Sequence, residues 1–372
     1  MQHKKNLAFE LMRIVAAFFV IFNHTGEDGF LLYAGYPDNS LQYWLYACVT
    51  VFCKMAVPLF FAVSGALLLG KRGESLATVY RKVGRIAMVL VLWSLFYYSY
   101  DMYVSQQIVS PDTFFIEFLK KLYTQELNGV FWYLYAYIGY LMTLPILREI
   151  ASSLSTKTFL YLFGLALFCF AILPMTEYLL WQDNYNINSK ILPSWLNYNF
   201  ARTGQIFVCP LLGYFLNEKT KNFWNLKRIL LLNLANVFAV IFSIYMIHFK
   251  SLVYEMTVPT LDLFYSNFDL LGATTVFVTI QYVIKNRKQT AGKPLLKRLE
   301  QLTYSMGACS FGIYLMHSFV IGQTLDRLLF PLRNSLHLNP MIAVLLYCGI
   351  VLAICYIVTL LLRHLPLLRK LV

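Results

Sequence analysis

The chain has 372 residues, of which 59% are hydrophobic and only 13% are charged, and its mean hydropathy is +0.59. A soluble protein of ordinary composition carries about twice that share of charge, roughly 25%. The composition therefore excludes a globule that covers its own core with polar surface in water. Apolar stretches of about twenty residues recur along the chain, which is the length a helix needs to cross the hydrocarbon of a bilayer.

The sequence predicts one membrane-embedded domain over residues 1–372. The polar gaps between apolar stretches are too short to fold alone, and no repeat with a solenoid-like period is present. The seven cysteines all fall inside apolar segments without a CxxC or Cys/His pattern, so neither a metal site nor a disulfide framework is indicated. The basic N-terminal segment resembles the start of a signal peptide. However, its apolar run contains Glu10 and Arg13, so we expect a retained helix.

The predicted fold is all-α, a polytopic transmembrane bundle of about ten helices with both termini in the cytoplasm. Apolar runs place these helices near residues 7–25, 43–69, 84–104, 129–147, 158–181, 203–217, 229–248, 268–284, 304–325 and 341–362. Between the third and fourth, Phe114, Phe118 and Leu122 recur every fourth residue. This spacing predicts an amphipathic helix that lies at the outer interface.

Basic residues set the orientation of this bundle. With the N-terminus inside, the inner segments hold 22 of the 31 lysines and arginines and the outer segments hold seven, while Arg13 and Lys54 lie within spans. This asymmetry follows the positive-inside rule. It also accounts for the net charge of +13, because basic residues at helix ends face anionic lipid head groups. We therefore expect a lipid bilayer as partner and no nucleic acid.

Ionisable residues in the first helix are the strongest functional signal. An arginine or lysine at the bilayer centre costs about 2.5–3.5 kcal/mol by insertion scales. Arg13 and His24 are eleven residues apart, which puts both on one helix face, about 16 Å apart along the axis. Glu10 lies one turn before Arg13 and is close enough to pair with it.

Two interpretations fit these three residues. Glu10 and Arg13 could form a structural ion pair near the inner head groups, with His24 capping the helix end. Alternatively they form a site, because arginine binds phosphate bidentately and histidine is the usual general base near neutral pH. An anionic cofactor could then anchor at Arg13 and extend its reactive end to His24.

Later spans add further candidates, each with a structural alternative. Lys54 lies mid-span, where snorkelling is the alternative. Ser64 follows Pro58, and a kinked helix packed through small residues explains that run equally well. Trp132 opens the fourth span, where an aromatic belt is expected in any case. His317 lies deep in the ninth span, and structural hydrogen bonding accounts for it as well as a site role does.

These candidates belong to an ordered series of short motifs. The series comprises Arg13 and His24 spaced as R-x10-H, Val57-Pro58-Leu59-Phe60-Phe61 with Ser64-Gly65, Arg81-Lys82 with Arg85-Ile86, Phe131-Trp132-Tyr133-Leu134 with Pro145, Pro210-Leu211-Leu212-Gly213-Tyr214, and Ser310-Phe311-Gly312-Ile313-Tyr314-Leu315 with His317. In this order and spacing, from the first predicted helix to the ninth, the chain resembles the acyltransferase-3 family of bacterial membrane O-acyltransferases.

The resemblance implies an inner-membrane enzyme of cell-envelope polysaccharide modification that transfers an acyl group, usually acetyl, to a hydroxyl. The implied donor is acyl-CoA, without a metal, and the implied acceptor is a cell-surface glycan or a lipid-linked precursor. A partner protein in envelope polymer synthesis is compatible with this role. The resemblance further implies His24 as the catalytic histidine and Arg13 as its motif partner at the donor. Arg81 and Arg85 would contact the donor phosphates on the cytoplasmic side.

Two mechanisms and a competing class remain open at the level of sequence. In direct transfer, His24 takes the proton of the acceptor hydroxyl while Lys54 or Ser64 stabilises the oxyanion. In a relay, Ser64 or His24 carries the acyl group. A transporter or flippase of a lipid-linked glycan or small solute would also explain intramembrane charge. Such transporters usually contain internal repeats with broken helices, and because we find no second copy of the first two spans, we favour the acyltransferase.

Overall fold

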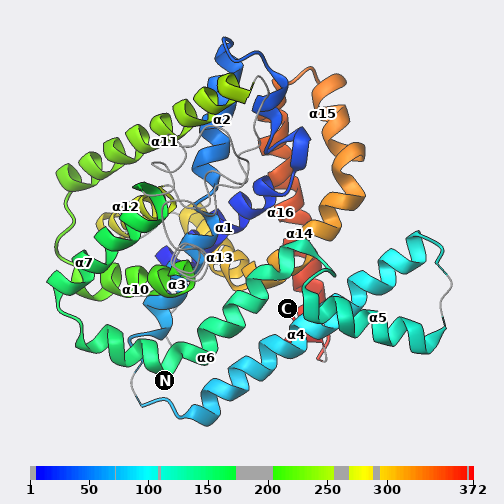
Figure 1. Ribbon diagram of the computed structural model, residues 1–372, viewed down its shortest axis with the longest axis horizontal. Coiled ribbons are helices and arrows are strands. Elements are labelled where there is room, and N and C mark those ends of the chain that lie inside the picture. Colours follow the sequence, from blue (N-terminus) through cyan, green and yellow to red (C-terminus); the bar gives the residue numbers. More distant parts are fainter. Residues whose placement is uncertain are drawn as a thin grey trace.

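The helix that contains Arg13 and is capped at its C-terminal end by His24 lies near the middle of the molecule (Figure 1). The computed structural model describes residues 6–71, 73–107, 110–172, 204–254, 268–287, 294–366 and 368–372. These residues form helices joined by turns and contain no β-strand, which confirms the all-α class. The α-helices in chain order are α1 (Leu7–Asn23), α2 (Leu41–Cys53), α3 (Ala56–Leu68), α4 (Leu76–Val104), α5 (Pro111–Thr124), α6 (Trp132–Ser153), α7 (Thr156–Leu167), α10 (Gly204–Tyr214), α11 (Leu226–Tyr254), α12 (Asp269–Asn286), α13 (Pro294–Ala308), α14 (Ser310–Thr324), α15 (Phe330–Asn334) and α16 (Pro340–His364).

Five stretches within the described ranges are long and apolar enough to cross a membrane: α2 with α3, α4, α6 with the turn before it, α11 and α16. The number rises to six if the bent pair of α13 and α14 counts as one span. Each of the ten predicted spans coincides at least in part with a helix, although the second half of the fifth lies outside the described residues. The multi-pass membrane character is therefore supported by these helices.

The first helix begins where Asn6 caps it, because the Asn6 side chain accepts a hydrogen bond from the Ala8 amide at 3.0 Å. Such a cap satisfies one of the amides that a helix start leaves without a partner. From there α1 packs against α3, α12, α13, α14 and α16. Gly307 of α13 allows a close approach to α1, because an added Cβ there would lie 2.4 Å from a carboxylate oxygen of Glu10.

The second predicted span is broken into α2 and α3 by a turn at Lys54 and Met55. Pro58 supplies the physical reason, since it has no N–H to donate to the Lys54 carbonyl four residues earlier. The side-chain amide of Asn23, the last residue of α1, donates to the neighbouring Cys53 carbonyl at 3.2 Å. The break therefore places Lys54 next to the last residues of α1.

Small residues bring α3 and α10 into close contact, as the sequence predicts for Gly65. A Cβ added to Gly65 would lie 2.0 Å from the backbone oxygen of Pro210. Reciprocally, a Cβ on Gly213 would lie 1.8 Å from the backbone oxygen of Ala62. Backbones this close are possible only where both helices present glycine.

Besides the broken second span, several helices differ from their predicted bounds; for example, α6 ends at Ser153 and α11 at Tyr254, beyond the predicted ends near residues 147 and 248. The helix α4 begins at Leu76 rather than near residue 84, because Ser75 with its extended backbone starts it earlier. The ninth predicted span is a helix pair, α13 and α14, bent by 70° at Cys309. Arg363 of α16 stabilises the bend by donating to the Ala308 carbonyl at 3.2 Å, which the bend removes from the helical ladder.

The turn between α3 and α4 is tied to α6 by an ion cluster. Glu74 accepts hydrogen bonds from Lys82 and from Arg148, each at 2.5 Å, and Arg148 also donates to the Leu68 carbonyl at 3.0 Å. Partial burial alone would raise the pKa of Glu74, but the bonds and charges of Lys82 and Arg148 hold that pKa below its ordinary value. The carboxylate is thus kept ionised by its partners.

Candidate active site

His24 is the residue that ends α1, and its side chain is exposed. Its Nδ1 lies 3.1 Å from the carbonyl oxygen of Val20, one turn earlier. A carbonyl can only accept a hydrogen bond, so Nδ1 carries the hydrogen in the neutral ring. The other ring nitrogen, Nε2, is left with a lone pair that can accept a proton from a substrate.

A second histidine lies directly beside it. The ring of His317 on α14 lies 5.0 Å from the ring of His24, centroid to centroid. His317 is fully buried, and its Nδ1 lies 2.5 Å from the Tyr314 carbonyl. Its Nε2 has no hydrogen-bond partner within the described part of the chain. Both imidazoles therefore share one tautomer, fixed by backbone carbonyls.

Lys54 lies at the break between α2 and α3, near His24. Its ammonium group lies 4.4 Å from the ring centroid of Phe30, a cation–π contact, and is within electrostatic range of His24. A cation in this place can attract negative charge that develops near the His24 ring.

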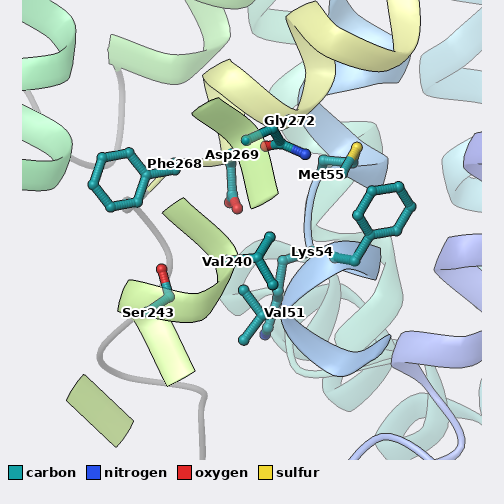
Figure 2. Close-up of a pocket in the computed structure, with 10 residues that line it drawn as sticks. Val51, Lys54, Met55, Val240, Ser243, Phe268, Asp269 and Gly272 are labelled. Atoms are coloured by element: carbon teal, nitrogen blue, oxygen red, sulfur yellow. The ribbon is translucent and has the colours of Figure 1, made fainter. Parts of the chain in front are cut away.

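Asp269, the first residue of α12, faces Lys54 across a small cavity (Figure 2). The cavity has a volume of about 20 Å³, enough for roughly one water molecule. Asn236 and Ser243 of α11 complete its polar lining, and Asp269 lies within electrostatic range of Lys54. Sequence reasoning did not single out Asp269, although an acidic residue at the start of an apolar run is a usable signal.

Arg13 lies toward the opposite end of α1. Its guanidinium donates to both carboxylate oxygens of Glu10, at 3.1 and 3.3 Å, which confirms the predicted pairing. Its side chain is 30% exposed, and it lies within electrostatic range of Tyr133 and Tyr137 on α6. Ser64 of α3 reaches the same place and lies within hydrogen-bonding reach of Tyr137.

A row of rings runs between α6 and α14 alongside α1, which we name the ring seam. Tyr137 stacks on Tyr133 with 5.8 Å between centroids, and Tyr133 lies 5.2 Å from Tyr314. Tyr314 in turn lies 5.7 Å from His317, the neighbour of His24. The hydroxyl of Tyr314 donates to the Val130 carbonyl at 2.5 Å. Arg13 and His24 therefore border two ends of the same seam.

The remaining predicted residues lie apart from this centre. Arg81 bonds to Ala77 and Thr78 of its own helix, and Arg85 donates to the backbone of the C-terminal segment. Trp132 is 41% exposed and touches the edge of Tyr133. Ser64 lies near the middle of α3, whereas Lys54 lies at the break before that helix, so the two are at different levels of the molecule.

The described residues contain no group of three or more His, Cys, Asp or Glu side chains suited to hold a metal ion. No curated protein and no solved structure matches this chain significantly. A family model described as an acyltransferase domain, by contrast, matches residues 6–360. This match spans the R-x10-H pair, both histidines of the site and the ring seam, and nearly the whole chain. The chain belongs to the acyltransferase-3 family.

Proposed function

We propose that this protein is a membrane O-acyltransferase with His24 as its general base. The donor is acyl-CoA, with acetyl as the favoured acyl group. The acceptor is a hydroxyl of a cell-surface glycan or of a lipid-linked precursor. The observation that carries the proposal is the hydrogen bond from His24 Nδ1 to Val20, which leaves Nε2 as a base on an exposed side chain beside Lys54 and His317.

The chemistry needs one proton acceptor and one cation at the carbonyl. His24 Nε2 takes the hydroxyl proton as the acceptor oxygen attacks the thioester carbon. The ammonium of Lys54 stabilises the negative charge on the carbonyl oxygen of the tetrahedral intermediate. When the C–S bond breaks, the imidazolium returns its proton to the departing thiolate, so the products are an ester and a free thiol. Direct transfer of this kind requires no acyl-enzyme.

The arrangement in the membrane is part of the proposal. We propose ten spans in a bacterial inner membrane with both termini in the cytoplasm, as the basic residues favour. Arg13 then lies toward the cytoplasmic side and His24 toward the outer side. Arg13 would contact the donor. Arg81 and Arg85 would lie on the cytoplasmic side of the membrane, from which the donor is supplied.

The test is His24→Ala expressed in cells that lack the native protein. O-acyl groups on the surface glycans, measured by mass spectrometry, should be present with the wild type and absent with His24→Ala. The amount and melting temperature of the purified variant should match the wild type. His337→Asn serves as the control, because His337 is an exposed loop residue with φ of 49°, a conformation that asparagine tolerates.

Retained O-acylation in His24→Ala would remove this residue as the base. A different result would favour the transporter class instead. If loss of the protein abolishes the glycan itself rather than its acyl groups, transport of a lipid-linked precursor explains the phenotype and the acyltransferase proposal is wrong.

A further inference from the structure

A polar recess lies between α13 and α16, at the bend that precedes α14. It has a volume of about 530 Å³ and is lined by Gln301, Tyr304, Ser305, Ala308 and Arg363. None of these residues belongs to the motifs or to the site around His24. The recess is thus a second feature of the molecule that the reaction at His24 does not explain.

The recess is rich in hydrogen-bond donors. One nitrogen of Arg363 is occupied by the Ala308 carbonyl and the Cys309 sulfur, which leaves the other N–H groups of the guanidinium for a ligand. Ser305 accepts from the Tyr356 hydroxyl at 2.7 Å, so its own hydrogen remains available. A fixed guanidinium with neighbouring hydroxyls is the donor set that phosphate oxygens favour.

A second cation extends this surface. Lys297 lies four residues before Gln301 on α13, and the positions of Lys297, Gln301, Ser305 and Ala308 follow one face of that helix. Lys297 is exposed and lies one helical turn before Gln301, which lines the recess, so it adds a cation next to the recess on α13, whereas Arg363 lines the recess from α16. Two cations around a polar hollow indicate an anionic ligand with more than one charge.

The position of the recess relative to α1 suggests which ligand this is. Gly307, which precedes Ala308, packs against Glu10, the partner of Arg13. From Glu10 to His24, α1 rises by about 21 Å. A ligand that binds its phosphate in the recess and reacts at His24 needs an extended arm of this order, as the phosphopantetheine arm of coenzyme A is.

We propose that the recess between α13 and α16 binds the phosphate groups of the acyl donor, with Arg363 and Lys297 as the residues that hold them. This inference rests on the proposed function, because it assigns the donor site of the same reaction. It places the phosphates on α13 and α16 rather than at Arg81 and Arg85 of α4.

The test is calorimetric binding of coenzyme A to the purified full-length protein and to single variants. Arg363→Gln and Lys297→Gln should each weaken the affinity at least tenfold. Lys285→Gln is the control and should stay within twofold of the wild type, because Lys285 is an exposed lysine in the last turn of α12 that does not line the recess. The KM for acetyl-CoA should rise in the same two variants without a change in kcat. Their kinetics with S-acetyl-pantetheine, which has no phosphate, should equal those of the wild type.

Other results would overturn the assignment. If Arg81→Gln and Arg85→Gln weaken binding while the recess variants do not, the phosphates bind on α4. If the recess variants change only the affinity for nanodiscs that contain anionic phospholipid, the recess binds a lipid head group instead. Lys297→Gln guards against a folding artefact, because within the described ranges Lys297, unlike Arg363, makes no hydrogen bond at the bend. A wild type that binds no coenzyme A would refute the proposed function itself. A His24→Ala variant that binds coenzyme A but transfers no acyl group would show that donor binding in the recess does not depend on the catalytic role of His24.

Discussion

The rings of His24 and His317 meet edge to face, with centroids 5.0 Å apart and planes at 87° to each other. One ring is exposed at the end of α1 and the other is fully buried in α14. Each donates its Nδ1 hydrogen to a backbone carbonyl one turn away or less. The buried ring of His317 therefore packs against the His24 ring and restricts its rotation, and a general base needs such a fixed orientation.

From this contact we expect His317 to act as a positioning residue. In His317→Asn the amide can still donate to the Tyr314 carbonyl, but the ring edge against His24 is lost. Misplacement of a catalytic group by about 1 Å can cost about 100-fold in rate, so kcat should fall by about 10- to 100-fold with little change in KM. Steady-state kinetics give both parameters. A rise in KM at unchanged kcat would contradict this role.

Lys54 should contribute to the transition state rather than to donor binding. Lys54→Met removes the cation near His24 while keeping the length of the stem, and loss of one oxyanion donor costs about 10²–10³ in kcat. Lys54→Arg should retain part of the rate. The control is Lys121→Met, since Lys121 also lies over an aromatic ring, 5.4 Å from the centroid of Tyr98, but outside the site. Equal rates for Lys54→Met and the wild type would disprove the role.

The contact of α3 with α10 should not tolerate a side chain in place of either glycine. Gly65→Ala and Gly213→Ala would each force a methyl group into opposing backbone, and overpacking of this kind costs about 1–3 kcal/mol. The melting temperature in detergent should fall in both variants. Gly139→Ala is the matched control, because an added Cβ on this α6 residue meets no neighbour within 4 Å. That variant should melt no lower than the wild type.

The ion cluster at Glu74 should make a pH-dependent contribution to stability. The pKa of Glu74 is held below its ordinary value of 4.5, so its contribution is fully present above the unfolded-state pKa and is lost as pH falls through the native one. Glu74→Gln should therefore lower the stability at neutral pH, by about 1.5–3 kcal/mol if the bonds behave as charged hydrogen bonds. Melting curves measured from pH 7 downward should converge with those of the wild type in acid. A difference that persists at the lowest pH would argue against the ion pairs as its source.

Much of the fold could be predicted, because apolar runs and the capping residues at their ends mark a helix within a short stretch of sequence. The bounds of α1 and α16 differ from the predicted ones by only one or two residues, since polar caps and basic ends mark them in the sequence. The bend at Cys309 could not be found this way, because it depends on a bond that Arg363 donates from another helix. The pairing of Glu10 with Arg13 was predictable for the opposite reason, as both partners lie on one helix turn.

The sequence by itself determined that the chain is helical and apolar, that Arg13 and His24 share one face of α1, and which family motifs it carries. These properties follow from helical periodicity and composition, which act over a few residues. Only the tertiary structure decided that His317 packs against His24, that Lys54 lies within electrostatic range of His24, and that Asp269 faces Lys54. These residues come from helices far apart along the chain, and packing between helices depends on the shapes of all the neighbouring side chains rather than on local spacing.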